Sequence, residues 1–312
     1  MLTPDLRRTL FERLIDDAGL FPPTRLAMPE ALAAHAANRV GPLAWVQGRF
    51  IVPASKLPEV VPAWPGPLSS LRLSVVADAA GQADPDAFAA TLDADLAAAA
   101  ALERREGRVR IELLEVRLPD PDLVEVVAPA VRRAGFDGPV TAFLEAPDST
   151  DVAVVRATVA AVSAARSAGA TRLGAKIRTG GLEPAMIPPP EAVAAFLAAS
   201  VGRGVPFKAT AGLHHPVRGV DPPSGMQMYG FVNLLAATAL LRAGGIDERR
   251  APEVLTEEDA AAFTVHAEAF GWRRQTVDGP AVASVRTDAL TAYGSCSFDE
   301  PTADLAALGW LP

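Results

Sequence analysis

Lysine is almost absent from this 312-residue chain. Of its 29 basic residues only Lys56, Lys176 and Lys208 are lysines, and the rest are arginines. Arginine replaces lysine as a solvated charge, but its guanidinium group does not supply the neutral amine that imine chemistry requires. Lys176 and Lys208 lie in similar contexts, each near the end of an apolar run that breaks into a glycine-containing loop. These two lysines are therefore the first candidates for catalytic residues.

Cysteine, long apolar runs and basic runs are also scarce. The one cysteine, Cys296, excludes an internal disulfide, which fits a reducing cytoplasm. The net charge of −8 and the lack of any basic run beyond an Arg pair argue against nucleic-acid binding. The apolar runs at 192–199 and 231–242 are too short or too interrupted for a membrane span, and the N-terminus shows no secretory pattern. We expect a cytoplasmic protein with a small-molecule substrate, no cofactor and no bound metal; assembly into a homo-oligomer is left open.

Strand-like runs alternate with Ala-rich helical runs along most of the chain. Strands are predicted at 43–53, 71–78, 109–118, 140–145, 172–177 and 206–209, and helices at 85–104, 121–134, 150–168 and 191–202. Glu112, Glu145, Lys176 and Lys208 occupy comparable places in four of these strands, at spacings of about one βα unit. The pattern predicts a single domain over 1–312, a TIM-type (β/α)8 barrel. An open doubly wound sheet is the competing fold, but no Gly-x-Gly-x-x-Gly follows the first strand.

The N-terminal segment and the part of the chain after residue 212 do not follow this alternation of strands and helices. Residues 4–19 are predicted as an N-terminal helix, and 212–280 as an insertion after the sixth strand, with a lid loop at 212–228 and a helix at 230–242. Thr256–Asp259 resembles a capping box, which predicts a helix through Phe263. That helix competes with a weak seventh-strand candidate at 262–266. A last short strand is expected at 293–298, before a closing helix at 302–308.

Two segments around the lysines resemble deoxyribose-phosphate aldolase. They are Ala168-Gly-Ala-Thr-Arg-Leu-Gly-Ala-Lys-Ile-Arg-Thr-Gly-Gly181 and Val205-Pro-Phe-Lys-Ala-Thr-Ala-Gly212. That family has a K-x-x-T-G strand end and a second lysine in a glycine turn. The resemblance extends in the same order over most of 10–215 and over Tyr293-Gly-Ser-Cys-Ser297. It implies a barrel fold and Schiff-base aldolase chemistry.

The resemblance also assigns roles to individual residues. Lys176 matches the family's Schiff-base lysine, and Lys208 the second lysine that lowers the pKa of the first. Glu112 matches a strand aspartate that transfers protons, and Asp16 falls near an aspartate that positions a water or the second lysine. Gly181 and Ala211-Gly212 replace the family's phosphate-binding residues, so the resemblance does not carry a phosphorylated substrate over to this chain.

The residues themselves suggest how a lysine could become reactive. If Lys176, Arg178 and Lys208 share one pocket, the neighbouring cations and burial would lower the pKa of a lysine amine. The structural alternative is that both lysines form salt bridges with Glu112 and Glu145. Glu112 and Glu115 lie three residues apart and should face opposite sides of a regular strand. We favour Glu112 as the acid or base and keep Glu115 as the alternative; Glu145 acts in catalysis or pairs with a lysine.

The remaining candidates are predicted to bind substrate. Arg178 suits a carboxylate or phosphate group, and a structural ion pair is its alternative. His214 and His215 follow the sixth predicted strand, where substrate contact is favoured over metal binding. The full substrate-binding set is Arg178, Thr179, Gly180, Gly212, His214, His215, Gly294, Ser295 and Cys296. Two other functions stay open: a metal-dependent barrel lyase or hydrolase using His214, His215 and glutamates, and a non-catalytic binding protein.

Overall fold

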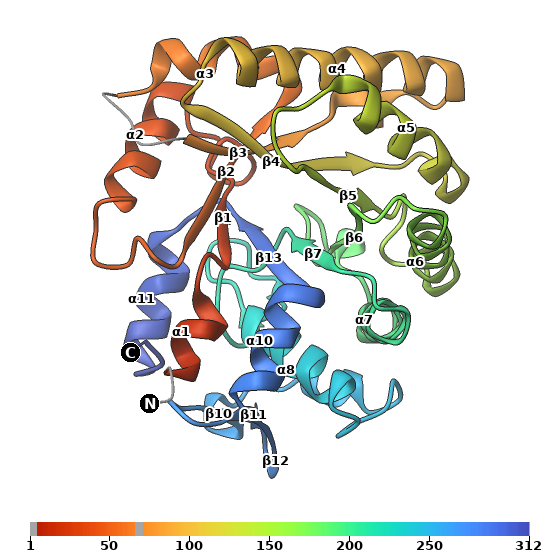
Figure 1. The fold of residues 1–312 in the computed structure, drawn as a ribbon. Helices are drawn as coiled ribbons and strands as arrows, with labels where there is room; N and C mark the ends of the chain where they lie inside the picture. The colour runs from red at the N-terminus through yellow and green to blue at the C-terminus, as the bar shows by residue number, and fades with distance from the viewer. Residues whose placement is uncertain (1–4, 66–70, 312) are drawn as a thin grey trace.

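Eight parallel strands form a closed barrel in the computed structural model, which describes residues 5–65 and 71–311 (Figure 1). Around the barrel the strands follow the order β1-β13-β7-β6-β5-β4-β3-β2, so strands adjacent in the chain are mostly adjacent in space. This confirms the predicted (β/α)8 fold. The barrel strands are β1 (Ile15–Asp17), β2 (Gln47–Pro53), β3 (Leu71–Val76), β4 (Val109–Arg117), β5 (Thr141–Glu145), β6 (Leu173–Arg178), β7 (Phe207–Thr210) and β13 (Leu290–Ser295).

Helices follow the strands and cover the outside of the barrel (Figure 1). The four Ala-rich helices predicted from the sequence correspond to α4, α5, α6 and α7. The α-helices are α1 (Leu6–Phe11), α2 (Met28–Asn38), α3 (Leu57–Ala63), α4 (Pro85–Arg105), α5 (Val124–Ala134), α6 (Val152–Ser167), α7 (Pro190–Arg203), α8 (Phe231–Arg242), α9 (Ala251–Leu255), α10 (Gly279–Asp288) and α11 (Asp299–Ala307).

The N-terminal segment contains a barrel strand that the predicted helix at 4–19 missed. Helix α1 ends at Phe11, Arg13 has a positive φ of 49°, and β1 pairs with β13 and β2. Leu14 and Ile15 are buried, as the helical pattern required. A buried strand of three residues has no periodicity of its own, so apolar spacing cannot separate it from the end of a helix. With β1 counted, the strand at 207–210 is the seventh of the barrel, and the insertion follows that strand.

The predicted seventh strand at 262–266 exists, but it lies outside the barrel. β10 (Phe263–Val265) pairs antiparallel with β11 (Phe270–Trp272), which pairs with β12 (Gln275–Val277). The predicted helix from Thr256 through Phe263 is wrong. The Asp259 side chain accepts a hydrogen bond from the Ala261 backbone N–H at 2.9 Å, but it caps a 3-10 turn at Ala260–Ala262 that leads into β10. The loop after β7 carries a small hairpin of β8 (Gly219–Val220) and β9 (Gln227–Met228).

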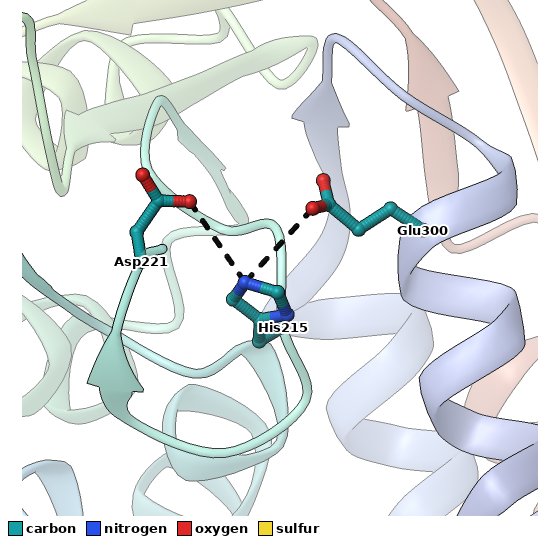
Figure 2. A group of neighbouring side chains, drawn as sticks. All are labelled: His215, Asp221 and Glu300. Carbon is teal, nitrogen blue, oxygen red and sulfur yellow. Dashed lines mark ion pairs between the residues drawn. The ribbon is translucent and has the colours of Figure 1, made fainter. Parts of the chain in front are cut away.

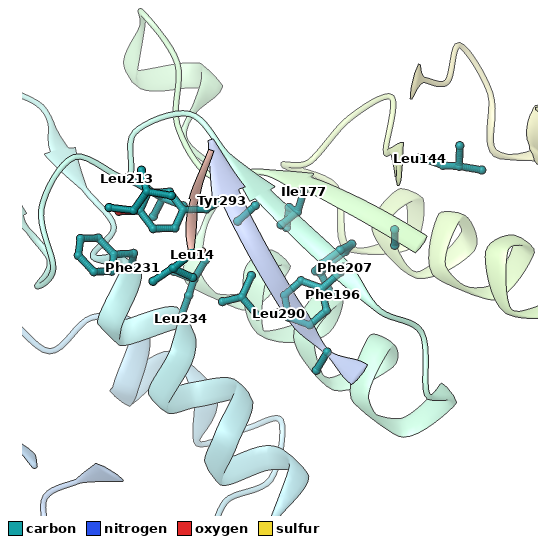
Figure 3. Packing of buried hydrophobic residues seen from close by; sticks show 14 of the residues in the cluster. Leu14, Leu144, Ile177, Phe196, Phe207, Leu213, Phe231, Leu234, Leu290 and Tyr293 are labelled. Carbon is teal, nitrogen blue, oxygen red and sulfur yellow. The ribbon is translucent and has the colours of Figure 1, made fainter. Parts of the chain in front are cut away.

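The core lies between the barrel and its outer helices (Figure 3). Phe196 on α7 packs edge-on against Phe207 on β7, and Phe231 on α8 stacks on Tyr293 of β13. Residues Pro184–Arg203 are long and apolar enough to cross a membrane by length and composition. Within this segment, 44% of the 18-residue stretch that meets the test is buried inside the protein. Helix α7 in the same segment buries Ala192–Leu197. Packing on the barrel therefore accounts for its apolar composition.

Candidate active site

Lys176 and Lys208 point into the barrel from neighbouring strands. They are register partners on β6 and β7. The Lys208 side chain is fully buried, and 6% of the Lys176 side chain is exposed. Burying an ammonium group is costly unless it is paired and hydrogen-bonded, so the partners of these two amines determine the chemistry of the barrel interior.

Three carboxylates bind the two amines in a continuous network. Lys208 Nζ donates to Asp16 Oδ2 at 2.5 Å and to Glu115 Oε1 at 2.7 Å. Lys176 Nζ lies 2.6 Å from Glu115 Oε2 and 2.8 Å from Glu145 Oε2. Glu115 Oε1 also accepts a hydrogen bond from the Ser74 hydroxyl at 2.6 Å. Glu115 therefore connects the two lysines, and we call Asp16, Glu115, Glu145, Lys176 and Lys208 the lysine cluster.

Arginines lie at both ends of the lysine cluster. At one end Arg178 Nε lies 3.5 Å and Arg117 Nε 4.0 Å from Glu145 Oε1, and both arginines are partly exposed. At the other end Arg49 donates its backbone N–H to Asp16 Oδ1 at 2.7 Å. Since Arg117 and Arg178 end strands β4 and β6, they lie at the C-terminal end of the barrel, where barrel enzymes bind substrate.

The charges in the lysine cluster stabilise each other in the ionised form. Burial would lower the pKa of Lys176, but the carboxylates of Glu115 and Glu145 outweigh it and raise the pKa above its usual value. Burial would also raise the pKa of both glutamates, yet the Lys176 and Lys208 ammonium groups hold the pKa of Glu115 well below its usual range, and Lys176 lowers the pKa of Glu145. The expectation that neighbouring cations lower the pKa of Lys176 is therefore wrong for the resting protein, because carboxylates separate the cations.

Glu115, rather than the favoured Glu112, contacts the lysines. Among the ion pairs of residues 5–65 and 71–311, Glu112 binds Arg13 and Arg49 and neither lysine. The reason is a register shift between β3 and β4, where Leu73 pairs with Ile111 and Ser74 with Leu113. This bulge adds one residue to β4, so the alternation of faces reverses across it. The expectation that Glu112 and Glu115 face opposite sides of a regular strand does not apply across this bulge, and of the two only Glu115 contacts the lysines.

Three residues expected to bind substrate make contacts between neighbouring loops. The Thr179 hydroxyl is buried and donates to the backbone oxygen of Ala211 at 2.7 Å. Gly180 and Gly212 meet backbone to backbone, because a Cβ on Gly180 would lie 2.8 Å from Gly212 Cα. These contacts fix the ends of β6 and β7 side by side, which is a positioning role.

Arg178 is partly exposed at the end of β6, and Gly294 and Ser295 lie at the end of β13. The Arg178 side chain is 34% exposed, and its buried Nε has no hydrogen-bond partner. A Cβ on Gly294 would lie 3.0 Å from Ile51 Cδ1 and 3.4 Å from Thr210 Oγ1, so a side chain at this position would crowd these neighbours. Ser295 is buried next to it at the end of β13.

His214, His215 and Cys296 belong to a second polar cluster, between the loop after β7 and helix α11. Cys296 Sγ lies 3.8 Å from His214 Nδ1, and that nitrogen lies 3.1 Å from Glu300 Oε2. Contact with Cys296 and Glu300 outweighs burial and raises the pKa of His214 to about 9. Burial would raise the pKa of the Cys296 thiol, but the hydrogen bond with His214 lowers it.

Several polar residues of these two clusters were not among the sequence candidates. They are Ser74, Arg117, Asp221, Glu300 and Asp304. Asp221 lies in the expected lid loop, and Glu300 follows the Gly-Ser-Cys-Ser segment, so proximity to candidate segments was the only signal. Nothing in one sequence separates such residues from ordinary surface carboxylates.

No known protein-family model and no curated protein sequence matches the chain. Among solved structures it is similar to two structures of the carboxyl transferase domain of Rhizobium etli pyruvate carboxylase, one with pyruvate and biocytin and one with oxalate. The identities are 14% and 15% and the TM-scores 0.38 and 0.40, over 81% of this chain in each case. The chain spans about half of those chains, 48%. The closed barrel defines the class of protein, and the function has to be argued from the lysine cluster.

Proposed function

We propose that this protein is a lysine-dependent lyase of the aldolase type, acting on a small carbonyl compound that carries an anionic group. The observation that carries the proposal is the shared carboxylate of Glu115, which binds the amines of both Lys176 and Lys208. A purely structural pair would need one carboxylate for each lysine. Here two buried amines and three carboxylates form one network through which protons can pass.

Lys176 is the residue that forms the imine. It lies next to Glu145, Arg117 and Arg178 at the C-terminal end of the barrel, and its side chain retains some exposure. Lys208 is fully buried between Asp16 and Glu115. A carbonyl carbon entering from the mouth therefore meets Lys176 before Lys208, and Lys208 acts as the charged partner of Glu115.

Imine formation requires Lys176 to lose a proton, because its raised pKa keeps the amine protonated at neutral pH. Glu115 and Glu145 are within 3 Å and accept that proton when a substrate displaces part of the network. The amine nitrogen then attacks the carbonyl carbon, and the carbonyl oxygen takes two protons and leaves as water. The product is a protonated imine between Lys176 and the substrate.

The protonated imine withdraws electrons from the adjacent carbon, and this permits cleavage of a carbon–carbon bond. The bond between the α and β carbons breaks, and its electron pair forms an enamine with the imine carbon. The β-hydroxyl gives its proton to a carboxylate of the lysine cluster, and the β carbon leaves as a carbonyl compound. Protonation of the enamine and addition of water release the second product and restore Lys176. Arg178 and Arg117 bind the anionic group of the substrate at the mouth.

Borohydride trapping tests this proposal. The protein is incubated with a panel of aldehydes and 2-oxo acids, reduced, and mapped by peptide mass spectrometry. The reduced adduct is expected on Lys176, absent in Lys176→Met and retained in the matched control Lys56→Met, which changes the one lysine outside the barrel interior. No adduct with any carbonyl compound, or an adduct that Lys176→Met leaves unchanged, would overturn the proposal.

A further inference from the structure

Three potential metal ligands meet beside the barrel mouth without touching one another. They are His215 in the loop after β7, Asp221 in the same loop, and Glu300 in the first turn of α11 (Figure 2). His215 Nε2 lies 3.8 Å from Asp221 Oδ1 and 4.0 Å from Glu300 Oε1, and all three atoms lie within 4.8 Å of one another. These separations exceed hydrogen-bond length, so none of the three atoms is hydrogen-bonded to another.

Each of the three side chains is oriented by its other polar atom. His215 Nδ1 lies 2.7 Å from Asp304 Oδ2, Asp221 Oδ2 accepts the Ser224 hydroxyl and backbone N–H, and Glu300 Oε2 lies 3.1 Å from His214 Nδ1. The remaining atom of each pair points to the shared space. A carboxylate on the far nitrogen of a histidine is the usual companion of a metal-binding imidazole, since it fixes the tautomer with a lone pair on the ligating nitrogen.

The Nε2 atom of His215 is buried and has no hydrogen-bond partner of its own. A buried polar atom without a partner is costly, whereas one bound to an ion is satisfied. We propose that His215, Asp221 and Glu300 bind a divalent transition metal ion of the zinc class, with Asp304, Ser224 and His214 holding the ligands in place.

The donor set selects the class of ion. One imidazole nitrogen with two carboxylates suits zinc and its neighbours, whereas calcium and magnesium prefer oxygen ligands alone. Tetrahedral zinc, with ligands at about 2.0–2.2 Å, holds its donor atoms about 3.3–3.6 Å apart. The donors here are spaced more widely, at 3.8 and 4.0 Å from His215 Nε2 and within 4.8 Å of one another, so rotations of the side chains would close the site around the ion. Three protein ligands leave a fourth position for water or a substrate oxygen.

The ion would join two connections at the C-terminal end of the barrel. His215 and Asp221 lie in the long loop that follows β7, Glu300 lies in the helix that follows β13, and β7 and β13 are neighbours in the sheet. Binding would fasten this loop to α11 on the side of the barrel where the lysine cluster opens. This site is independent of the proposed imine chemistry, which needs no metal.

Zinc binding to the purified chain tests the site. After EDTA treatment and dialysis, Zn²⁺ is titrated by calorimetry, and retained metal is measured by mass spectrometry. One equivalent is expected, with a higher Tm for the loaded protein. His215→Ala should weaken zinc binding by 100-fold or more, and Asp304→Asn by roughly 10–100-fold. The matched control His266→Ala, which removes an exposed histidine outside the cluster, should bind as the wild type does.

Zinc affinity that His215→Ala leaves unchanged, or no binding by the wild type, would overturn the proposal and identify the cluster as a network of ion pairs. If His215→Ala does not fold, as circular dichroism would show, Asp221→Asn serves in its place. Borohydride trapping at Lys176 in the metal-free protein keeps the two proposals apart. An adduct without zinc binding would overturn only the proposed metal site. Zinc binding without an adduct would overturn only the proposed imine chemistry.

Discussion

Lys176 and Lys208 are register partners on neighbouring barrel strands, and their amines bind different oxygens of the Glu115 carboxylate. The charge of either amine therefore affects the other through one buried group. This relationship distinguishes the pair from two separate salt bridges, and it determines what each of the following changes should do.

Glu115→Gln should shift the pH profile of borohydride trapping at Lys176 to lower pH, because it removes one of the two carboxylates that raise the pKa of Lys176. It should also lower the free energy of unfolding by on the order of 3–5 kcal/mol, since it leaves buried charges unpaired. Glu112→Gln is the matched control. Glu112 is partly exposed and binds Arg13 and Arg49 but neither lysine, so its loss should cost on the order of 1 kcal/mol and leave trapping intact. Chemical denaturation and trapping yields measure both effects; equal effects of the two substitutions would contradict the assignment of Glu115.

The rate of imine formation should rise with pH through the neutral range. Because Glu115 and Glu145 raise the pKa of Lys176, the free amine is a minor species there, and its fraction grows about tenfold per pH unit. Glu145→Gln removes one of the two negative charges, so the pKa of Lys176 should fall and the profile should shift to lower pH. Initial rates of trapping between pH 6 and 10 measure the shift. A wild-type rate that is already constant at pH 7 would argue against a protonated resting Lys176.

Acid should destabilise the protein through Glu115 and Glu145. Both have a folded-state pKa below the unfolded value, so their contribution is present above about pH 4.5 and is lost as pH falls through the folded pKa values. Each adds about 1.4 kcal/mol per pH unit to the slope in that window. Urea denaturation at a series of pH values measures the slope of the free energy of unfolding against pH. For Glu145→Gln this slope should be smaller by the contribution of one titrating group. The same slope for both proteins would show that Glu145 does not titrate as described.

At alkaline pH the stability should fall as pH rises, because of Lys176. Its folded pKa lies above the unfolded value, so its contribution is present below about pH 10.5 and is lost as pH rises through the raised pKa. Between these limits the lysine cluster should give a stability that does not depend on pH. A maximum confined to neutral pH would have to come from groups outside the lysine cluster.

Gly48→Ala should disturb the lysine cluster from the neighbouring strand. A Cβ at this position would lie 2.1 Å from Asp16 Oδ1 and 3.1 Å from the Ile15 backbone oxygen, so the Asp16 side chain would have to move away from Lys208. We expect a loss of roughly 1–3 kcal/mol in stability. The control Gly81→Ala places its methyl group where no atom lies within 4 Å, and it should be nearly neutral. A Gly48→Ala protein as stable as this control would show that Asp16 has room to adjust.

The sequence by itself determined the barrel and the position of its lysines. Apolar runs at a spacing of one βα unit predicted six of the eight strands, since each βα unit must bury a similar length of strand and helix, and the expected last strand at 293–298 overlaps β13. The scarcity of lysine then marked Lys176 and Lys208 as candidates, but whether they share one pocket was left open by the sequence and decided by the structure. These signals come from the local sequence, so one sequence is enough to show them.

Only the tertiary structure decided which groups meet the lysines. The bulge in β4 that brings Glu115 to the two amines depends on the register with β3, and no local pattern around Glu112 encodes it. The strand at Ile15–Asp17 is too short to show a period. His215, Asp221 and Glu300 come from two segments that lie far apart in sequence and approach only because β7 and β13 are neighbours in the closed sheet. Contacts of this kind arise from how the strands pair around the barrel, which the order of residues along one strand does not specify.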